Sequence, residues 1–140
     1  QWWEAGAQPP QWLASGDVIM TSAYNGRISA AIKEGRNFKI VWKGQNYAVD
    51  SWVIPKGSPN LDLAYDFIKF ASQPENQAIS AAAVPYGPTN VKAVAAVDPK
   101  IAPNLPTYPA NLVGSVATDA EWWVDHIEEL SARFNVWAAQ

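Results

Sequence analysis

The chain has 140 residues, a net charge of −3, 49% hydrophobic and 16% charged residues, no cysteine and a single histidine. This composition is typical of a globular protein with one core, and it excludes disulfides, thiolate zinc sites, multi-histidine metal sites and catalytic cysteines. The ten Lys and Arg residues are scattered, which argues against a nucleic-acid partner.

The first half of the chain predicts alternating helices and strands. Residues 9–16 predict a short helix, because proline suits a first helical turn and glycine suits the C-terminal cap. Residues 18–24 are β-rich and predict a strand, and apolar positions at helical spacing predict a helix over 27–35. Residues 38–42 predict a second strand, and the apolar run over 46–55 predicts a third.

The second half predicts mainly helices and turns. A polar cap and an apolar stripe predict a helix over 60–71, and a second helix is expected over 75–83. Residues 84–90 are dense in turn formers and predict a loop with an aromatic ring, Tyr86, at its centre. Four prolines between 99 and 109 make a long helix or strand there improbable.

The C-terminal segment carries the strongest helical signal. Residues 118–121 form a capping box, and apolar residues recur every three to four positions from Trp123 to Trp137. We expect this stripe to pack against the core. His126 lies beside the stripe and is interpreted as a polar residue at the boundary of a packed face.

Asp50 is the chemically most informative residue, because it lies at the centre of the apolar run over 46–55. A carboxylate on a buried strand needs a cation or hydrogen-bond donors to replace its lost hydration. The partner is either an internal Arg or Lys, at position 27, 36 or 43, or the cation of a ligand. Trp52 would share the face of Asp50 on a strand, and a carboxylate beside aromatic rings suits an organic ammonium group.

Enzyme motifs are absent from the sequence. There is no G-x-S-x-G motif, phosphate-binding loop or dinucleotide fingerprint. Carboxylates for glycoside hydrolysis could be drawn from Asp17, Glu34 and Asp50, but their spacing does not select them. A hydrolase or carbohydrate-active domain remains the alternative, and it predicts that the eight tryptophans line one exposed face.

Four segments in order resemble the C-terminal part of periplasmic spermidine/putrescine-binding proteins of ABC transporters. The segments are SAYNGR at 22–27, YAVDSWVIPKG at 47–57, the predicted helix and proline of 60–74, and VPYGPTN at 84–90. Tyr108-Pro109 and the closing helix from Glu121 also fit. The resemblance implies an α/β fold of the type II periplasmic binding class, with two lobes joined by strand crossovers, and a binding protein that needs no cofactor and is not an enzyme.

The resemblance also implies how the chain is organised. Residues 1–46 would be part of the second lobe, 47–57 a crossover strand and hinge, and 58–140 the C-terminal part of the first lobe. The chain would therefore lack an N-terminal part that completes both lobes. Its other partners would be a small amine and the transmembrane subunits of an ABC permease, its location would be the periplasm, and most of its tryptophans would be buried.

By the same resemblance, three positions correspond to ligand contacts of polyamine binders, and neighbouring residues complete the site. The expected ligand-binding residues are Tyr24, Asn25, Arg27, Asp50, Trp52 and Tyr86, with Asp50 and Tyr86 facing one cleft. A ring that some relatives place two positions before the carboxylate is Ala48 here, and Arg27 would repel a dication. Putrescine, spermidine and a zwitterion such as 4-aminobutyrate therefore all remain candidate ligands.

Overall fold

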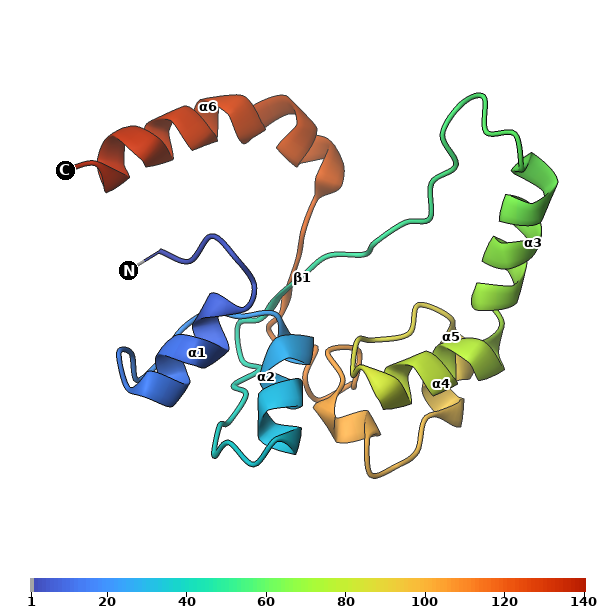
Figure 1. The fold of residues 1–140 in the computed structure, drawn as a ribbon, viewed down its shortest axis with the longest axis horizontal. Coiled ribbons are helices and arrows are strands. Elements are labelled where there is room, and N and C mark those ends of the chain that lie inside the picture. Colours follow the sequence, from blue (N-terminus) through green and yellow to red (C-terminus); the bar gives the residue numbers. More distant parts are fainter. Residues whose placement is uncertain (1) are drawn as a thin grey trace.

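The structure is a computed structural model, and it describes residues 2–140. Its helices and strands follow one another as shown in Figure 1. They are α1 (Gln8–Ser15), α2 (Asn25–Lys33), β1 (Asn46–Tyr47), α3 (Leu61–Ala71), α4 (Pro74–Ala83), α5 (Val91–Ala96), the 3-10 helix η1 (Ala102–Asn104), β2 (Val116–Ala117) and α6 (Ala120–Ala138).

The predicted helices are confirmed, and their ends have local causes. A proline occupies the first turn of both α1 and α4, where its missing N–H costs no hydrogen bond. Gly16 ends α1 with φ 84°, a left-handed conformation that glycine adopts without a steric penalty. The short α5 was not predicted. It begins at Asn90, whose side chain accepts a hydrogen bond from the backbone N–H of Lys92.

The prediction of strands over 18–24, 38–42 and 46–55 is wrong apart from Asn46–Tyr47. Within residues 2–140 the sheet consists of β1 and β2 alone, paired in parallel with Asn46 opposite Val116. β propensity describes side chains that suit a pleated sheet, but a strand exists only where a neighbouring backbone completes its hydrogen bonds. No such neighbour runs beside the other two segments in the part of the chain that the structure describes.

The buried core lies between α4, α5 and the segment that follows α5. Ala81, Val97 and Leu105 form its centre, and Leu105 is 1% exposed. Asn90 joins the neighbouring elements, because its side-chain Nδ2 donates to the Ser72 carbonyl and its backbone N–H donates to Gln77 Oε1. This region is therefore held by both apolar packing and partly buried polar contacts.

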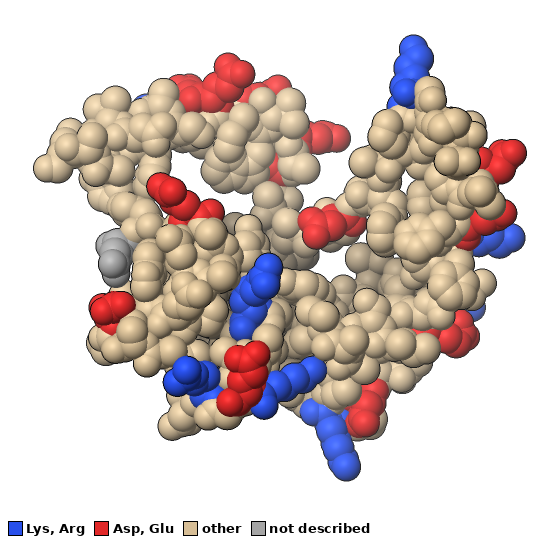
Figure 2. Space-filling view, viewed as in Figure 1, with Lys and Arg blue, Asp and Glu red and all other residues tan. Residues whose placement is uncertain are grey.

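Helices α3 and α6 differ from that core, because neither has a buried residue. Both project from the rest of the molecule, and the hollow between them is visible in Figure 2. The expectation that the stripe of α6 packs is wrong for this structure. Its main contact is at Trp2, whose ring lies edge-on to Phe134 and Trp137 at centroid distances of 5.0 and 5.4 Å. The residue that caps α6 is Asp119, which accepts from the N–H of Trp122.

The expectation that most tryptophans are buried is also wrong. Five are exposed, namely Trp2, Trp52, Trp122, Trp123 and Trp137. A ring needs a facing element to bury it, and α6 and residues 48–58 have little packed against them. None of the helices among residues 2–140 has the length and hydropathy needed to cross a bilayer.

Candidate ligand-binding site

The first turn of α2 gathers several of the predicted site residues. Tyr24 is the N-cap, with φ −68° and ψ 125°, and no side chain caps the helix. The backbone N–H groups of Arg27 and Ile28 donate to the Tyr24 carbonyl, and no acidic residue occupies the first turn. Because free N–H groups at a helix start carry a partial positive charge, this end of α2 favours an anionic group.

Tyr24 and Arg27 lie next to each other beside this turn. A methyl group placed on Gly6 would lie 3.2 Å from Tyr24 Cδ2 and 3.9 Å from Arg27 Nε, so the ring and the guanidinium flank the same glycine. The Arg27 side chain is thus directed along the side of α2 that carries Tyr24. A guanidinium and the free N–H groups of the helix together form a donor set suited to a carboxylate.

Trp3 belongs to this cluster and was missed by the sequence analysis. Its ring lies edge-on to Tyr24 at a centroid distance of 5.5 Å, and its Nε1 donates to Ser22 Oγ at 3.0 Å. Two consecutive tryptophans mark residues 2–3 in the sequence, but no periodicity there indicates which ring turns inward. Trp3 is half-buried, whereas Trp2 is exposed.

Tyr86 joins the cluster from a segment 60 residues farther along the chain. Asn25 Nδ2 donates to the carbonyl of Pro85 at 2.6 Å. The phenol of Tyr86 lies against Gly26, where an added methyl group would be 2.7 Å from its Cζ atom. The ring is nevertheless 49% exposed. Tyr24, Asn25, Arg27 and Tyr86 are therefore brought together at the first turn of α2.

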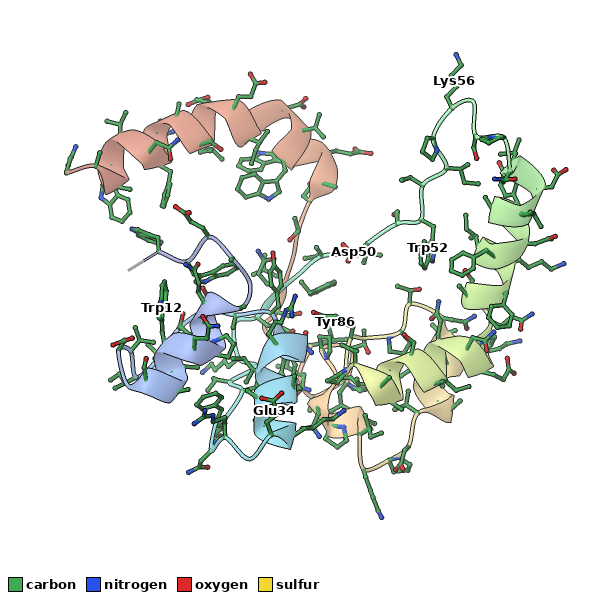
Figure 3. All side chains as sticks on the ribbon, viewed as in Figure 1. Trp12, Glu34, Asp50, Trp52, Lys56 and Tyr86 are labelled. Atoms are coloured by element: carbon green, nitrogen blue, oxygen red, sulfur yellow. The ribbon has the colours of Figure 1, made fainter. Side chains whose placement is uncertain are left out.

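Asp50 is exposed and lies on the connection between β1 and α3, so the premise of a carboxylate on a buried strand is wrong. The carboxylate keeps its contact with water because no sheet forms around it. An internal ion pair of Asp50 is not found within residues 2–140, where the ion pair present joins Arg133 to Glu129 at 3.4 Å. In Figure 3, Asp50 lies on the connection that passes the loop bearing Tyr86.

Trp52 lies farther along that connection, toward α3 (Figure 3). Its ring is edge-on to Phe67 of α3, at a centroid distance of 5.3 Å and an interplanar angle of 90°. The structure thus places Trp52 against α3, apart from the rings around α2.

An open cavity of ≈ 480 Å³ adjoins the cluster on the side of Trp3. Its lining residues are Trp2, Trp3, Trp12, Val18, Met20, Thr21 and Ser22. No charged side chain lines this cavity, so it offers no partner for an ammonium or a carboxylate. Within residues 2–140 there is also no group of three or more His, Cys, Asp or Glu side chains that could hold a metal ion.

Comparisons with known proteins point to one family. The family model described as "Bacterial extracellular solute-binding protein" matches residues 1–107. The chain is 56% identical over 140 residues to the gamma-aminobutyric acid-binding protein of Pseudomonas aeruginosa, covering 100% of this chain and 40% of that protein. It is 37% identical over 102 residues to the putrescine/cadaverine-binding protein of the same organism, covering 63% of this chain and 28% of that protein.

Solved structures show the same likeness. The Atu4243-GABA receptor superposes with a TM-score of 0.83 at 36% identity, covering 98% of this chain and 42% of that one. The binding protein AgtB of A. tumefaciens R10, in complex with agropinic acid, superposes with a TM-score of 0.79 at 34% identity, covering 99% of this chain and 44% of that one. The chain therefore spans less than half the length of these proteins.

Proposed function

Because the chain belongs to the bacterial extracellular solute-binding protein family, we propose that the full-length protein containing it is the substrate-binding component of an ABC importer for a small zwitterionic ω-amino acid such as 4-aminobutyrate. It would bind its ligand without chemical change in the periplasm and deliver it to the transmembrane subunits of the permease. Support comes from the 56% identity to a protein named for gamma-aminobutyric acid.

The observation that carries the ligand class is the placement of opposite charges on different segments. Arg27 lies beside Tyr24 at the uncapped start of α2, and the Asp50 carboxylate is free of any internal ion pair among the described residues. A 4-aminobutyrate molecule would present its carboxylate to Arg27 and the helix N–H groups. Its ammonium would meet Asp50, and the rings of Tyr24 and Tyr86 would cover its methylenes.

The proposed mechanism is closure of two lobes around the ligand. The contacts between α2 and the Tyr86 loop join the segment expected in the second lobe, 1–46, to the segment expected in the first, 58–140. A ligand that touches both segments binds the closed arrangement better than an open one, and it shifts the population toward closure. The permease would then recognise the closed form.

A polyamine is the second candidate, favoured by the 37% identity to a protein named for putrescine and cadaverine. Arg27 argues against it, because a guanidinium at the proposed ligand site would repel a diammonium ligand. The hydrolase alternative has no such support. Its tryptophans should share one face, but Trp52 packs on α3 whereas Trp2 packs on α6.

Thermal unfolding of the full-length protein with 4-aminobutyrate, putrescine and spermidine tests the proposal. A ligand at about 100 times its Kd stabilises the folded state by ~2.7 kcal/mol, so the Tm should rise most with 4-aminobutyrate. Arg27→Ala should abolish that rise and spare any response to putrescine. Arg36→Ala is the matched control, since Arg36 is an exposed cation just beyond α2. The zwitterion assignment would be rejected if the Tm rose most with putrescine. It would also be rejected if 4-aminobutyrate raised the Tm of Arg27→Ala as much as that of the wild-type protein.

A further inference from the structure

The loop that carries Tyr86 is fixed although the ring is half exposed. Pro85 and Pro88 are buried on either side of it. The backbone N–H of Tyr86 donates to the Val84 carbonyl at 2.7 Å, which closes a tight turn. Because proline also fixes its own φ, the backbone of this loop has little freedom to move the ring.

The ring rests on the backbone of α2 at Gly26. A methyl group on Gly26 would lie 2.7 Å from Cζ, 2.9 Å from the hydroxyl oxygen and 3.0 Å from Cε1 of Tyr86. Gly26 is helical and is not among the glycines with positive φ. Its lack of a side chain is therefore required by the space that the phenol occupies and not by the backbone conformation.

Two side chains of α2 hold the same loop from either end of the helix. Asn25 Nδ2 donates to the Pro85 carbonyl at 2.6 Å, and Lys33 Nζ donates to the Ala83 carbonyl at 3.2 Å. The Asn25 amide is thus engaged by the protein itself. On the opposite side of the loop, Gly87 lies against Thr107, whose Oγ1 would be 2.8 Å from a methyl group added at Gly87.

We propose that Gly26 and Asn25 are positioning residues that set the place of the Tyr86 ring in the ligand site. Gly26 leaves room for the phenol, and Asn25 acts through the Pro85 carbonyl without touching the ligand. This inference rests on the proposed function, in which Tyr86 covers the methylenes of 4-aminobutyrate. Its consequence is that the residue at position 26 controls affinity through a ring on a segment 60 residues away.

Isothermal titration of the full-length protein with 4-aminobutyrate tests the role of Gly26. Gly26→Ala should weaken binding about tenfold, because the displaced ring loses its ligand contact. The Tm without ligand should change little, since the half-exposed ring can turn away from the added methyl group and alanine has the higher helix propensity. Loss of affinity without loss of stability separates positioning from a structural role. Ala30→Ser is the control, because it adds one heavy atom at an exposed position of α2.

A double-mutant cycle identifies the ring as the cause. In a Tyr86→Ala background, Gly26→Ala should have no further effect on affinity, because the group it displaces is absent. Asn25→Ala should weaken binding about threefold to fivefold in the wild-type background and leave it unchanged in Tyr86→Ala, given a typical hydrogen-bond contribution. Additive losses in either cycle would overturn the inference.

One measurement needs no ligand, so it tests the contact between Tyr86 and Gly26 even if the proposed function is wrong. The α-protons of Gly26 should show a ring-current shift in the NMR spectrum of the full-length protein, and Tyr86→Ala should remove it. An unchanged Gly26 resonance would overturn the contact. Absence of binding by the wild-type protein to 4-aminobutyrate, putrescine and spermidine would instead overturn the proposed function.

Discussion

Two regions of the molecule differ in how well their apolar sequence pattern predicts which residues are buried. One is the region where α2 meets the Tyr86 loop, and the other is formed by α3 and α6. The first is a short helix facing a turn-rich loop, and it contains the buried residues Gly26, Ile28 and Pro85 and hydrogen bonds between distant segments. The second has regular apolar stripes but no buried residue. An apolar stripe therefore specifies that a helix forms, whereas glycines and amides specify which segments meet.

The largest expected effect tests the contrast in burial. Leu105→Ala should lower the free energy of unfolding by about 3 kcal/mol, because it leaves a cavity beside Ala81 and Val97. Leu63→Ala on α3, at a side chain 67% exposed, should cost less than about 0.5 kcal/mol. Urea unfolding of the 140-residue chain, to which these exposures refer, measures both. Equal losses in the free energy of unfolding for Leu105→Ala and Leu63→Ala would contradict the contrast in burial.

The second largest effect is expected at Asp50, on the connection between β1 and α3. Asp50→Asn should weaken binding of 4-aminobutyrate by about thirtyfold, because the ammonium loses its charged partner. The Tm without ligand should not change, since Asp50 is exposed and forms no ion pair among the described residues. Titration calorimetry and thermal unfolding give the two readouts. Asp62→Asn, an exposed carboxylate in the first turn of α3, is the control.

The third effect compares two helix caps. Asn90 accepts from the Lys92 N–H and donates to the Ser72 carbonyl, so Asn90→Ala should cost about 2 kcal/mol. Asp119 accepts only from the N–H of Trp122 and is exposed, so Asp119→Ala should cost about 1 kcal/mol or less. Hydrogen exchange should show protection lost across α4 and α5 in the first variant, and only at the start of α6 in the second. The reverse order of costs would contradict the comparison.

The smallest effect is expected on α6. Arg133→Gln removes an ion pair at 3.4 Å between side chains that are 72% and 70% exposed. Because such pairs are screened by water and salt, the free energy of unfolding should change by less than about 0.5 kcal/mol. Urea unfolding at low and high salt checks this. A salt-dependent loss above 1 kcal/mol would show that α6 is more tightly held than its exposure indicates.

The sequence predicted five of the six α-helices among the described residues, the family and the fold class, because each depends on local pattern or on short segments in a fixed order. It failed for the strands over 18–24 and 38–42. Their β propensity is real, but pairing depends on a neighbouring backbone that no local pattern encodes. The ladder found among residues 2–140 pairs Asn46–Tyr47 with a segment far along the chain.

The structure brings some of the predicted site residues together, but the sequence did not predict their arrangement. Tyr24, Arg27 and Tyr86 came from short motifs, and the structure places them around one helix turn. Trp3 could not be found, because its contact with Tyr24 spans an unpatterned stretch. The contact of Tyr86 with Gly26 could not be predicted either, since hydropathy does not indicate that a glycine leaves room for a ring.

The pairing of β1 with β2 also leads to an expectation about the order in which this chain folds. It closes a loop of about 70 residues, whose closure entropy costs about 4 kcal/mol, against backbone bonds such as Val116 N to Gln45 O at 2.8 Å. Those few bonds cannot repay that cost alone. We therefore expect the ladder to form late, after the α4–α5 core has placed the carbonyls of Pro106 and Asn111 where Gln45 Nε2 donates to them.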